Sequence, residues 1–369
     1  MTTERRSFSS CVSKPTRQPF IFYFNFILNI IKVVMDIFAS LSSSFELGLN
    51  VNDEEKLLNL RARSAGLTFC GCAHAAFVCE LVHSLTNTIR SRSAVRDSLV
   101  SGSDGGLCVG ILGLGHLGKQ LIFSLLSKTS IKPSNVKVST RNPETAEGRV
   151  PTGVECFFDN RRLALWADVL FLCCLPSHLS RVCSELHSRL PKRCLVYSFP
   201  SAVPVTSLAE LLGHSFVLKP QYEIEGCDAA DVWLTCSHLT TALGDPSLIE
   251  ASCPLTMKGG ITLRLNWVCG VLYGLLNICT SACLGSGEAL SLINSIFNKD
   301  GINNEQLEAR SFISSSCAST LHPDEPFPWI SLTDAQSKET PLQRFLSSSK
   351  SVQQSVCAAY KSFLERPGK

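Results

Sequence analysis

The sequence feature that most constrains the fold is a set of three glycines directly after a short apolar run. Residues 107–112 read Leu-Cys-Val-Gly-Ile-Leu, and Gly113, Gly115 and Gly118 follow in the order Gly-x-Gly-x-x-Gly. The first glycine of this pattern permits a tight turn, the second lets a pyrophosphate approach the backbone, and the third lets helix and strand pack closely. We therefore predict a strand, a phosphate-binding turn and a helix whose N-terminus faces a dinucleotide. The expected contacts in this turn are Gly113, Leu114, Gly115, His116, Leu117 and Gly118.

Short apolar runs alternate with helical patterns after this turn, and this alternation predicts the fold class. Apolar runs of this length suit strands buried on both faces, and the stretches between them suit crossover helices. The expected strands are 107–112, 136–140, 169–174, 194–199, 216–219 and 232–236, and the expected helices are 116–127, 178–190, 207–212 and 246–252. We therefore expect an α/β fold, a Rossmann-type doubly wound parallel sheet, followed by a mostly α-helical C-terminal domain.

A chain of 369 residues is too long for one compact core and fits two modest domains with extensions. We expect a tail with an amphipathic segment at 1–50, a helical extension and linker at 51–105, an NADP-binding Rossmann domain at 106–255 and a helical substrate and dimerisation domain at 256–369. Further helices are expected from Asn52, at 70–89, at 263–283 and at 341–364, and the linker is expected at 91–106.

The residues that end the second predicted strand discriminate between NAD and NADP. NAD enzymes usually carry an Asp or Glu there, which binds the ribose 2′-hydroxyl. This chain has Ser139, Thr140 and Arg141 instead, and no acid before Glu144. The arginine can pair with a 2′-phosphate, and the two hydroxyls can donate to it. We therefore predict NADP(H) as the cofactor; the alternative is an ordinary exposed arginine in a turn.

The distribution of charge argues against a nucleic-acid binder. The net charge of +3 lies entirely in residues 1–19, and the remaining 350 residues carry 30 basic and 30 acidic groups. A nucleic-acid-binding surface needs an excess of basic groups to displace counterions from phosphates. We therefore expect a small-molecule substrate and no nucleic-acid partner.

The segment Phe20–Ala39 has the length of a membrane span, but its polar residues favour another interpretation. Asn25, Asn29, Lys32 and Asp36 lie on one helical stripe, which predicts an amphipathic helix at a membrane surface. The tail before this segment is rich in Arg and Ser, as in a mitochondrial transit peptide. A third alternative is an extension without folded structure, with the functional chain beginning near Met35. We expect a cytoplasmic protein, with a mitochondrial location as the alternative.

Eighteen cysteines are many for this length, yet their spacing does not suit a metal site. The sequence contains no Cys-x-x-Cys pair, which structural zinc sites usually need. Several cysteines lie inside apolar runs, where the side chain acts as a small hydrophobic group. We expect buried free thiols in a reducing compartment and no metal.

The glycine turn, the run Ala-Asp-Val-Leu-Phe-Leu at 167–172 and the following Cys173-Cys174-Leu175-Pro176 together resemble the pyrroline-5-carboxylate reductase family. The resemblance covers about residues 107–220. It implies a Rossmann fold, use of NADPH and reduction of an imine, as in proline biosynthesis. It also implies that the loop with Cys174, Leu175 and Pro176 borders the nicotinamide, although the family's lysine is Leu175 here.

The resemblance does not extend to the segments that bind the substrate in the family. The family's Ser-Pro-Gly-Gly-Thr-Thr loop, which holds the substrate carboxylate, has no counterpart, and residues 285–289 only faintly resemble its Gly-Ser-Gly-Pro-Ala-Tyr segment. Where the family has an Asn-Thr-Pro-like turn, this chain reads Lys219-Pro220-Gln221-Tyr222. We infer that the cofactor domain is retained while the substrate site is replaced or lost.

Candidates for a proton donor beside a nicotinamide are Lys219, Tyr222, Arg264 and Asn266. The spacing Gly260-x-x-x-Arg264-x-Asn266 is similar to the Gly-x-x-x-Lys-x-x-Asn helix of β-hydroxyacid dehydrogenases, with Arg in place of Lys and Asn one residue early. The alternatives are a capped helix start for this pair and surface or packing roles for Lys219 and Tyr222.

These patterns lead to three hypotheses. The first is an NADP(H)-dependent oxidoreductase that transfers hydride between NADPH and a small imine or keto/hydroxy acid, with the C-terminal helices able to form a homo-oligomer. The second is a sensor or scaffold that binds NADP(H) without turnover. The third is a peripheral membrane protein anchored through Phe20–Ala39.

Overall fold

The computed structural model describes residues 51–96, 106–146, 148–224, 231–236, 238–297 and 305–367. Residues 59–369 form one compact unit, and the account below concerns that unit. The tail 1–50, with the predicted segment Phe20–Ala39, lies outside the described residues, as do positions 97–105 of the predicted linker.

A six-stranded parallel sheet with the order β3-β2-β1-β4-β5-β6 forms the centre of the Rossmann part. Its strands are β1 (Val109–Leu112), β2 (Val136–Ser139), β3 (Glu155–Phe157), β4 (Val169–Leu172), β5 (Leu195–Ser198) and β6 (Val217–Leu218). β1 pairs with β2 on one side and with β4 on the other, so the strand order reverses at β1. The predicted doubly wound parallel sheet is confirmed, and the short, half-exposed β3 is a strand that the sequence did not reveal.

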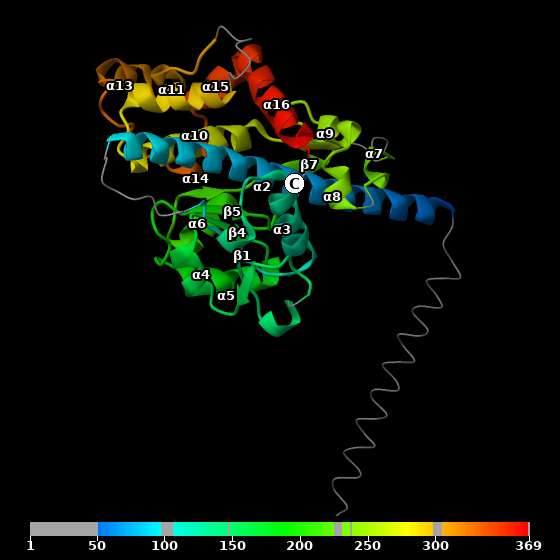
Figure 1. Cartoon of the computed structure of the whole chain (residues 1–369). Helices are drawn as coiled ribbons and strands as arrows, with labels where there is room; N and C mark the ends of the chain where they lie inside the picture. Colours follow the sequence, from blue (N-terminus) through cyan, green and yellow to red (C-terminus); the bar gives the residue numbers. More distant parts are fainter. Residues whose placement is uncertain are drawn as a thin grey trace, which may run out of the picture. The chain divides into compact units, whose positions relative to one another are not determined.

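Helices cover both faces of this sheet (Figure 1). One face packs on α4 (Asn160–Trp166), α5 (Pro176–Leu186) and α6 (Val205–Leu212) through Leu170, Leu172 and Val196. The other face, with Ile111, Phe171 and Tyr197, belongs to a larger core that also contains α3 (His116–Lys128), the long α2 (Val51–Arg96) and the C-terminal helices.

Helix α2 runs without a break from Val51 to Arg96, where two helices and a linker were expected. Its two glycines do not interrupt it because each lies under a large side chain: a Cβ at Gly66 would lie 2.7 Å from Trp233, and one at Gly71 3.2 Å from Phe199. By length and composition, Lys56–Arg92 would suffice to cross a membrane, but 78% of its apolar window is buried within the described protein. Burial in the core accounts for its apolar sequence.

The chain after the sheet is mostly helical, as predicted. A two-stranded antiparallel ribbon, β7 (Tyr222–Ile224) and β8 (Ile261–Leu263), frames the short helices α7 (Asp231–Leu234), α8 (Leu239–Ala242) and α9 (Pro246–Ser252). The helices that follow are α10 (Leu265–Ser281), α11 (Ser286–Phe297), α12 (Ala309–Phe312), α13 (Ser315–Thr320), α14 (Leu332–Ser337), α15 (Pro341–Ser348) and α16 (Lys350–Glu365).

Two predicted elements are wrong for identifiable reasons. The strand expected at 232–236 is largely helix α7, because the Trp233 indole N–H donates to the Gly259 carbonyl at 2.8 Å and anchors a compact turn. The single terminal helix expected at 341–364 is two helices. Ser349 separates them: its hydroxyl accepts from the Val352 N–H and donates to Glu305 at 2.6 Å.

Candidate functional site

A cleft of about 740 Å³ lies at the carboxyl end of the parallel sheet. Its walls come from the turn after β1, the residues that end β2, the loop after β4 and the loop after β5. In open α/β sheets, ligands bind at the carboxyl ends of strands where the strand order reverses. The cleft therefore lies where the topology favours a ligand site.

The three glycines of the motif have three different surroundings. Gly113 has a φ of +104°, which only glycine adopts readily, and its N–H donates to the Ser139 carbonyl at 2.9 Å. A Cβ on Gly118 would lie 2.1 Å from the Gly113 carbonyl oxygen, so this glycine allows the helix to lie against the turn. A Cβ on Gly115 would meet nothing within 4 Å, so the space beside its backbone is open to a ligand.

Helix α3 begins directly after Gly115. Among the described residues, no side chain caps its N-terminus, although Ser, Thr, Asp and Asn usually do so. The first N–H groups and the positive end of the helix dipole can therefore bind an anion. His116 and Leu117 in this first turn, with Leu114 before it, line the cleft, whereas Gly118 lies behind its wall.

The residues at the end of β2 differ in what they offer a ligand. Ser139 lines the cleft, but its buried hydroxyl donates to Asn160 at 2.7 Å, and Asn160 donates to the Glu185 carboxylate at 2.6 Å. Its expected donation to a 2′-phosphate is therefore not available in this arrangement. Thr140 and Arg141 also line the cleft, and Arg141 is exposed with no ion pair to the described residues.

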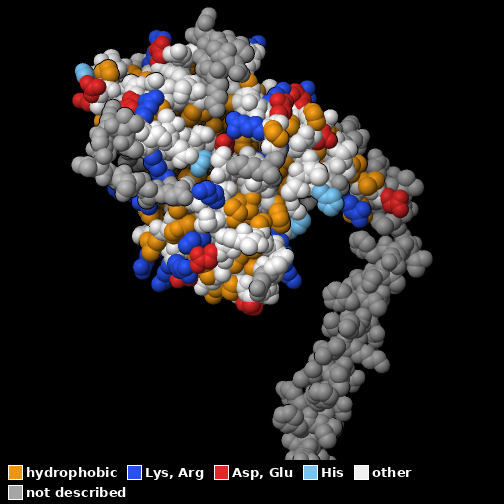
Figure 2. Space-filling view, viewed as in Figure 1, with side chains coloured by type: hydrophobic (Ala, Val, Ile, Leu, Met, Phe, Trp, Pro, Cys, Tyr) orange, Lys and Arg blue, Asp and Glu red, His pale blue; other side chains and the backbone are white. Residues whose placement is uncertain are grey.

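Basic groups outnumber acidic groups along the cleft. Four lining side chains are basic, His116, Arg141, His178 and Arg181, and Glu185 is acidic. Figure 2 shows Lys, Arg, Asp and Glu side chains interspersed over the face in view. The excess of basic groups in the cleft suits a ligand with several phosphates.

The loop after β4 forms the wall opposite the β2 end. The Cys173 N–H donates to the Leu112 carbonyl at 2.9 Å, and Pro176 begins α5. Cys174, Leu175 and Pro176 line the cleft together with Phe199, Pro200 and Ser201, which follow β5. The described cysteines are free thiols, and burial raises the pKa of Cys173 and of Cys174, so both are neutral at physiological pH.

The four catalytic candidates do not line this cleft, and three of them have side-chain partners elsewhere in the protein. The Tyr222 hydroxyl lies 2.8 Å from His74 Nδ1, Arg264 pairs with Glu223, and Asn266 donates to the Gln336 carbonyl at 2.8 Å. The Gly260-x-x-x-Arg264 pattern therefore marks the start of α10 and an exposed ion pair. Lys219 alone reaches a cleft residue, donating to the Ser201 carbonyl at 3.1 Å.

His74 of α2 is a fully buried residue whose partners the sequence did not reveal. Its Nε2 donates to the Ser252 carbonyl at 2.9 Å, so Nδ1 is the acceptor for the Tyr222 hydroxyl. Burial lowers its pKa to about 4, and the ring packs at tilted angles against Trp267 and Tyr360. The available signal was a histidine within the apolar stretch 69–79 of α2, which requires polar partners when buried.

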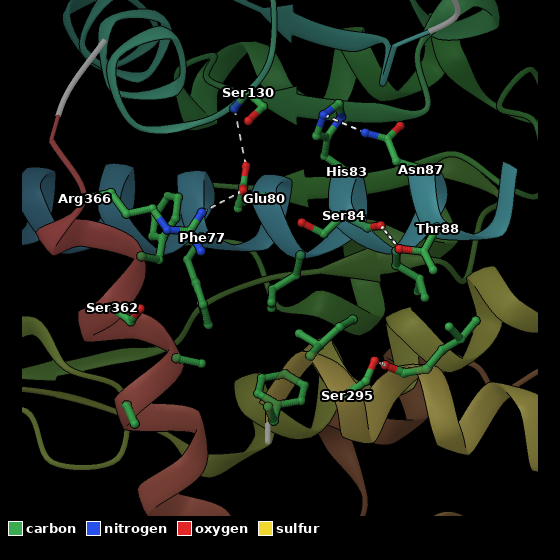
Figure 3. A pocket seen from close by; sticks show the side chains of 18 residues that line it. Phe77, Glu80, His83, Ser84, Asn87, Thr88, Ser130, Ser295, Ser362 and Arg366 are labelled. Atoms are coloured by element: carbon green, nitrogen blue, oxygen red, sulfur yellow. Dashed lines mark hydrogen bonds and ion pairs between the residues drawn. The ribbon is translucent and has the colours of Figure 1, made fainter. Parts of the chain in front are cut away.

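A second cavity, of about 570 Å³, lies between α2, α11 and α16 (Figure 3). Glu80 lies at one end, where it pairs with Arg366 at 3.1 Å and accepts from the Ser130 N–H. Hydroxyl groups of Ser84, Ser295 and Ser362 also face it. The cavity lacks the glycine turn found at the cleft, and its Arg366 is paired with Glu80.

Comparison with known proteins agrees with this geometry. Residues 108–199 match the family described as "NADP oxidoreductase coenzyme F420-dependent". Pyrroline-5-carboxylate reductase of Escherichia coli is 30% identical over 107 residues, which are 29% of this chain and 40% of that protein. The structure of pyrroline-5-carboxylate reductase from Coxiella burnetii aligns with 70% of this chain and 97% of its own, with 16% identity and a TM-score of 0.29.

A longer match comes from mouse. NADP-dependent oxidoreductase domain-containing protein 1 of Mus musculus is 38% identical over 334 residues, which are 86% of this chain and 90% of the mouse protein. The resemblance to the pyrroline-5-carboxylate reductases is confirmed for the Rossmann part. The chain therefore belongs to the family of NADP-dependent oxidoreductase domain-containing proteins, and its sheet is the Rossmann domain of an NAD(P)-dependent oxidoreductase.

Proposed function

We propose that this protein transfers hydride between NADPH and a small imine or keto/hydroxy acid, in a reaction like that of pyrroline-5-carboxylate reductase. The observation that carries the proposal is the cleft, which brings together the glycine turn, Thr140 and Arg141, and the loop at Cys174, Leu175 and Pro176. These three segments are 22 or more residues apart in the sequence, and one extended dinucleotide would contact them all.

The charges of the residues that line the cleft favour binding of NADPH over NADH. Arg141 is available at the end of β2, where an acid would repel a 2′-phosphate. Glu185, the acidic group of the cleft, is held by Asn160, which also accepts from Ser139. We expect Arg141 to pair with the 2′-phosphate and the first turn of α3 to bind the pyrophosphate.

The reaction requires binding and orientation from the protein, since the bound nicotinamide supplies the hydride. Phe199 and Pro200, with the loop at 173–176, form an apolar wall that excludes water from one end of the cleft. Cys173 and Cys174 remain thiols and do not take part in electron transfer in this proposal.

The test combines binding with turnover. Titration of the full chain with NADPH, followed by nicotinamide fluorescence, should show saturable binding that is tighter than NADH binding. Turnover is then measured on pyrroline-5-carboxylate, other cyclic imines and small keto acids. Absence of NADPH binding would contradict the proposal.

A sensor or scaffold that binds NADP(H) without turnover is the second candidate. The observation that favours it is the engagement of Tyr222, Arg264 and Asn266 with protein partners rather than with the cleft. NADPH binding without turnover across the whole panel of substrates would support this candidate over the enzyme.

We also propose a cytoplasmic location and a homo-oligomer formed through the C-terminal helices. The alternatives are import into mitochondria or attachment to a membrane surface through Phe20–Ala39. Fractionation of cells that express the full chain or a variant without residues 1–34 tests the location, because either alternative requires the distribution to change. Sedimentation of the purified chain tests the oligomer.

A further inference from the structure

Lys219 is a buried lysine beside the cleft. It follows β6 directly, and only 5% of the residue is exposed. Its Nζ donates to the Ser201 carbonyl at 3.1 Å, and Ser201 lines the cleft next to Phe199 and Pro200. Because the Phe199 N–H donates to the Leu172 carbonyl, this part of the wall adjoins the loop after β4. Lys219 thus lies at the end of the cleft where we expect the nicotinamide.

The hydrogen bonds of this ammonium group are incomplete. An ammonium has three N–H donors, and Ser201 provides the acceptor for one of them. No carboxylate among the described residues pairs with Lys219, and burial lowers its pKa without an opposing charge. A buried charge without a partner is unfavourable, and proteins usually pair it. Because this arrangement destabilises the protein, it indicates that the charge of Lys219 serves to bind a ligand.

Side chains of the C-terminal helices hold the backbone around Lys219 in place. The Lys219 N–H donates to Gln336 Oε1 at 2.9 Å, and Gln336 Nε2 donates to the Val217 and Leu332 carbonyls. Asn266 in turn donates to the Gln336 carbonyl. Helices α10 and α14 therefore hold the lysine directly behind Ser201 of the cleft wall, which is the pre-organisation that a binding group requires.

We propose that Lys219 anchors the carboxylate of an anionic substrate at this end of the cleft. This inference rests on the proposed function and narrows its substrate class to small acids. A carboxylate provides acceptors for the two remaining N–H donors and neutralises the charge, whereas the neutral analogue of the same substrate does neither. The protein should therefore discriminate strongly between an acid and its amide.

The first experiment measures thermal unfolding of the full chain with and without saturating NADP⁺, at constant ionic strength. The probes are acetate against acetamide and L-proline against L-prolinamide. We expect the acids to raise the Tm of the wild type and the amides to have little effect. Lys219→Met should raise the Tm of the ligand-free protein and abolish the shift caused by acids.

Two further variants control for folding and for charge. Lys219→Arg keeps the charge and should retain part of the response to acids. Lys338→Met removes an exposed lysine directly after α14, which pairs with Asp334, and should respond to acids as the wild type does. A lower Tm for ligand-free Lys219→Met, or equal responses of wild type and Lys219→Met to acids, would overturn the proposal.

The second experiment separates this inference from the proposed function. With an acidic substrate, Lys219→Met should raise KM about 100-fold and leave the Kd for NADPH unchanged. The unfolding experiment without NADP⁺ is decisive even if the wild type binds no NADPH, because it needs neither cofactor nor turnover. Failure to bind NADPH would thus contradict the proposed function alone, whereas indifference to acids would contradict the role of Lys219 alone.

Discussion

The residues expected to bind the cofactor and those expected to donate a proton to the substrate reach their places in different ways. On the cofactor side, Gly113, Gly115 and Arg141 lie at the ends of adjacent parallel strands, so the sheet itself brings them together. On the substrate side, Tyr222 and Asn266 contact partners from distant elements and lie away from the cleft. A motif located at strand ends therefore predicts well which residues lie together, whereas isolated polar residues in a helical region do not.

The sharpest test of the cofactor side is a pair of glycine substitutions. Gly118→Ala places a Cβ 2.1 Å from the Gly113 carbonyl oxygen, so the turn must shift, at an expected cost of about 3 kcal/mol. Gly115→Ala meets no atom within 4 Å and should fold normally, yet weaken NADPH binding at least about 10-fold. Chemical denaturation and NADPH titration measure the two effects. Equal free energies of unfolding for the two variants would contradict the different roles assigned to Gly118 and Gly115.

The next test addresses the choice between cofactors. Arg141→Glu replaces an expected ion pair with a repulsion and should weaken NADPH binding about 100-fold, or about 3 kcal/mol, with little change for NADH. Fluorescence titration with each cofactor measures the ratio. Arg161→Glu, an exposed residue of α4 outside the cleft, is the matched control. Equal losses for both cofactors would contradict the role of Arg141.

The substrate side gives a prediction for pH. Because burial lowers the pKa of His74 to about 4, the unfolded chain binds a proton below its ordinary pKa of about 6.5 while the folded protein does not. The contribution of His74 is therefore complete above pH 6.5 and declines as the pH falls toward 4. We expect a loss of about 2 kcal/mol between pH 7.5 and pH 5.

Denaturant titrations of the wild type and of His74→Phe at these two pH values isolate this contribution. The variant should be less stable at pH 7.5, because Tyr222 and Ser252 lose their partner, but should depend less on pH. If the stability of the variant depended on pH as strongly as that of the wild type, the pKa of His74 would not be lowered in the folded protein.

The smallest effect is expected at Leu175, where the chain departs from the reductase family. The residue is 63% exposed, so Leu175→Ala should change the free energy of unfolding by less than about 0.5 kcal/mol. Because Leu175 lines the cleft, NADPH affinity should fall a few-fold. A larger loss of stability would place Leu175 in the core rather than at the ligand site.

Much of the fold could be predicted from local patterns, and the errors have specific causes. The strands at 109–112, 169–172 and 195–198 were predictable because each is a short, mostly apolar run buried on both faces, and the strand at 136–139 because its two valines alternate with polar residues. The continuity of α2 was not, because it depends on Trp233 and Phe199 covering its glycines. Ser349 likewise ends α15 through contacts with Glu305 that no local pattern contains.

The sequence by itself determined the glycine turn after β1 and the basic residue that follows β2, because a glycine motif acts through its own backbone and needs only neighbouring strands. The tertiary structure decided the rest. It paired the Ser139 hydroxyl with Asn160, surrounded His74 with partners from four elements, and placed Lys219 against Ser201. Hydrogen bonds between residues far apart in the chain depend on the packing of whole helices, which no spacing along the sequence encodes.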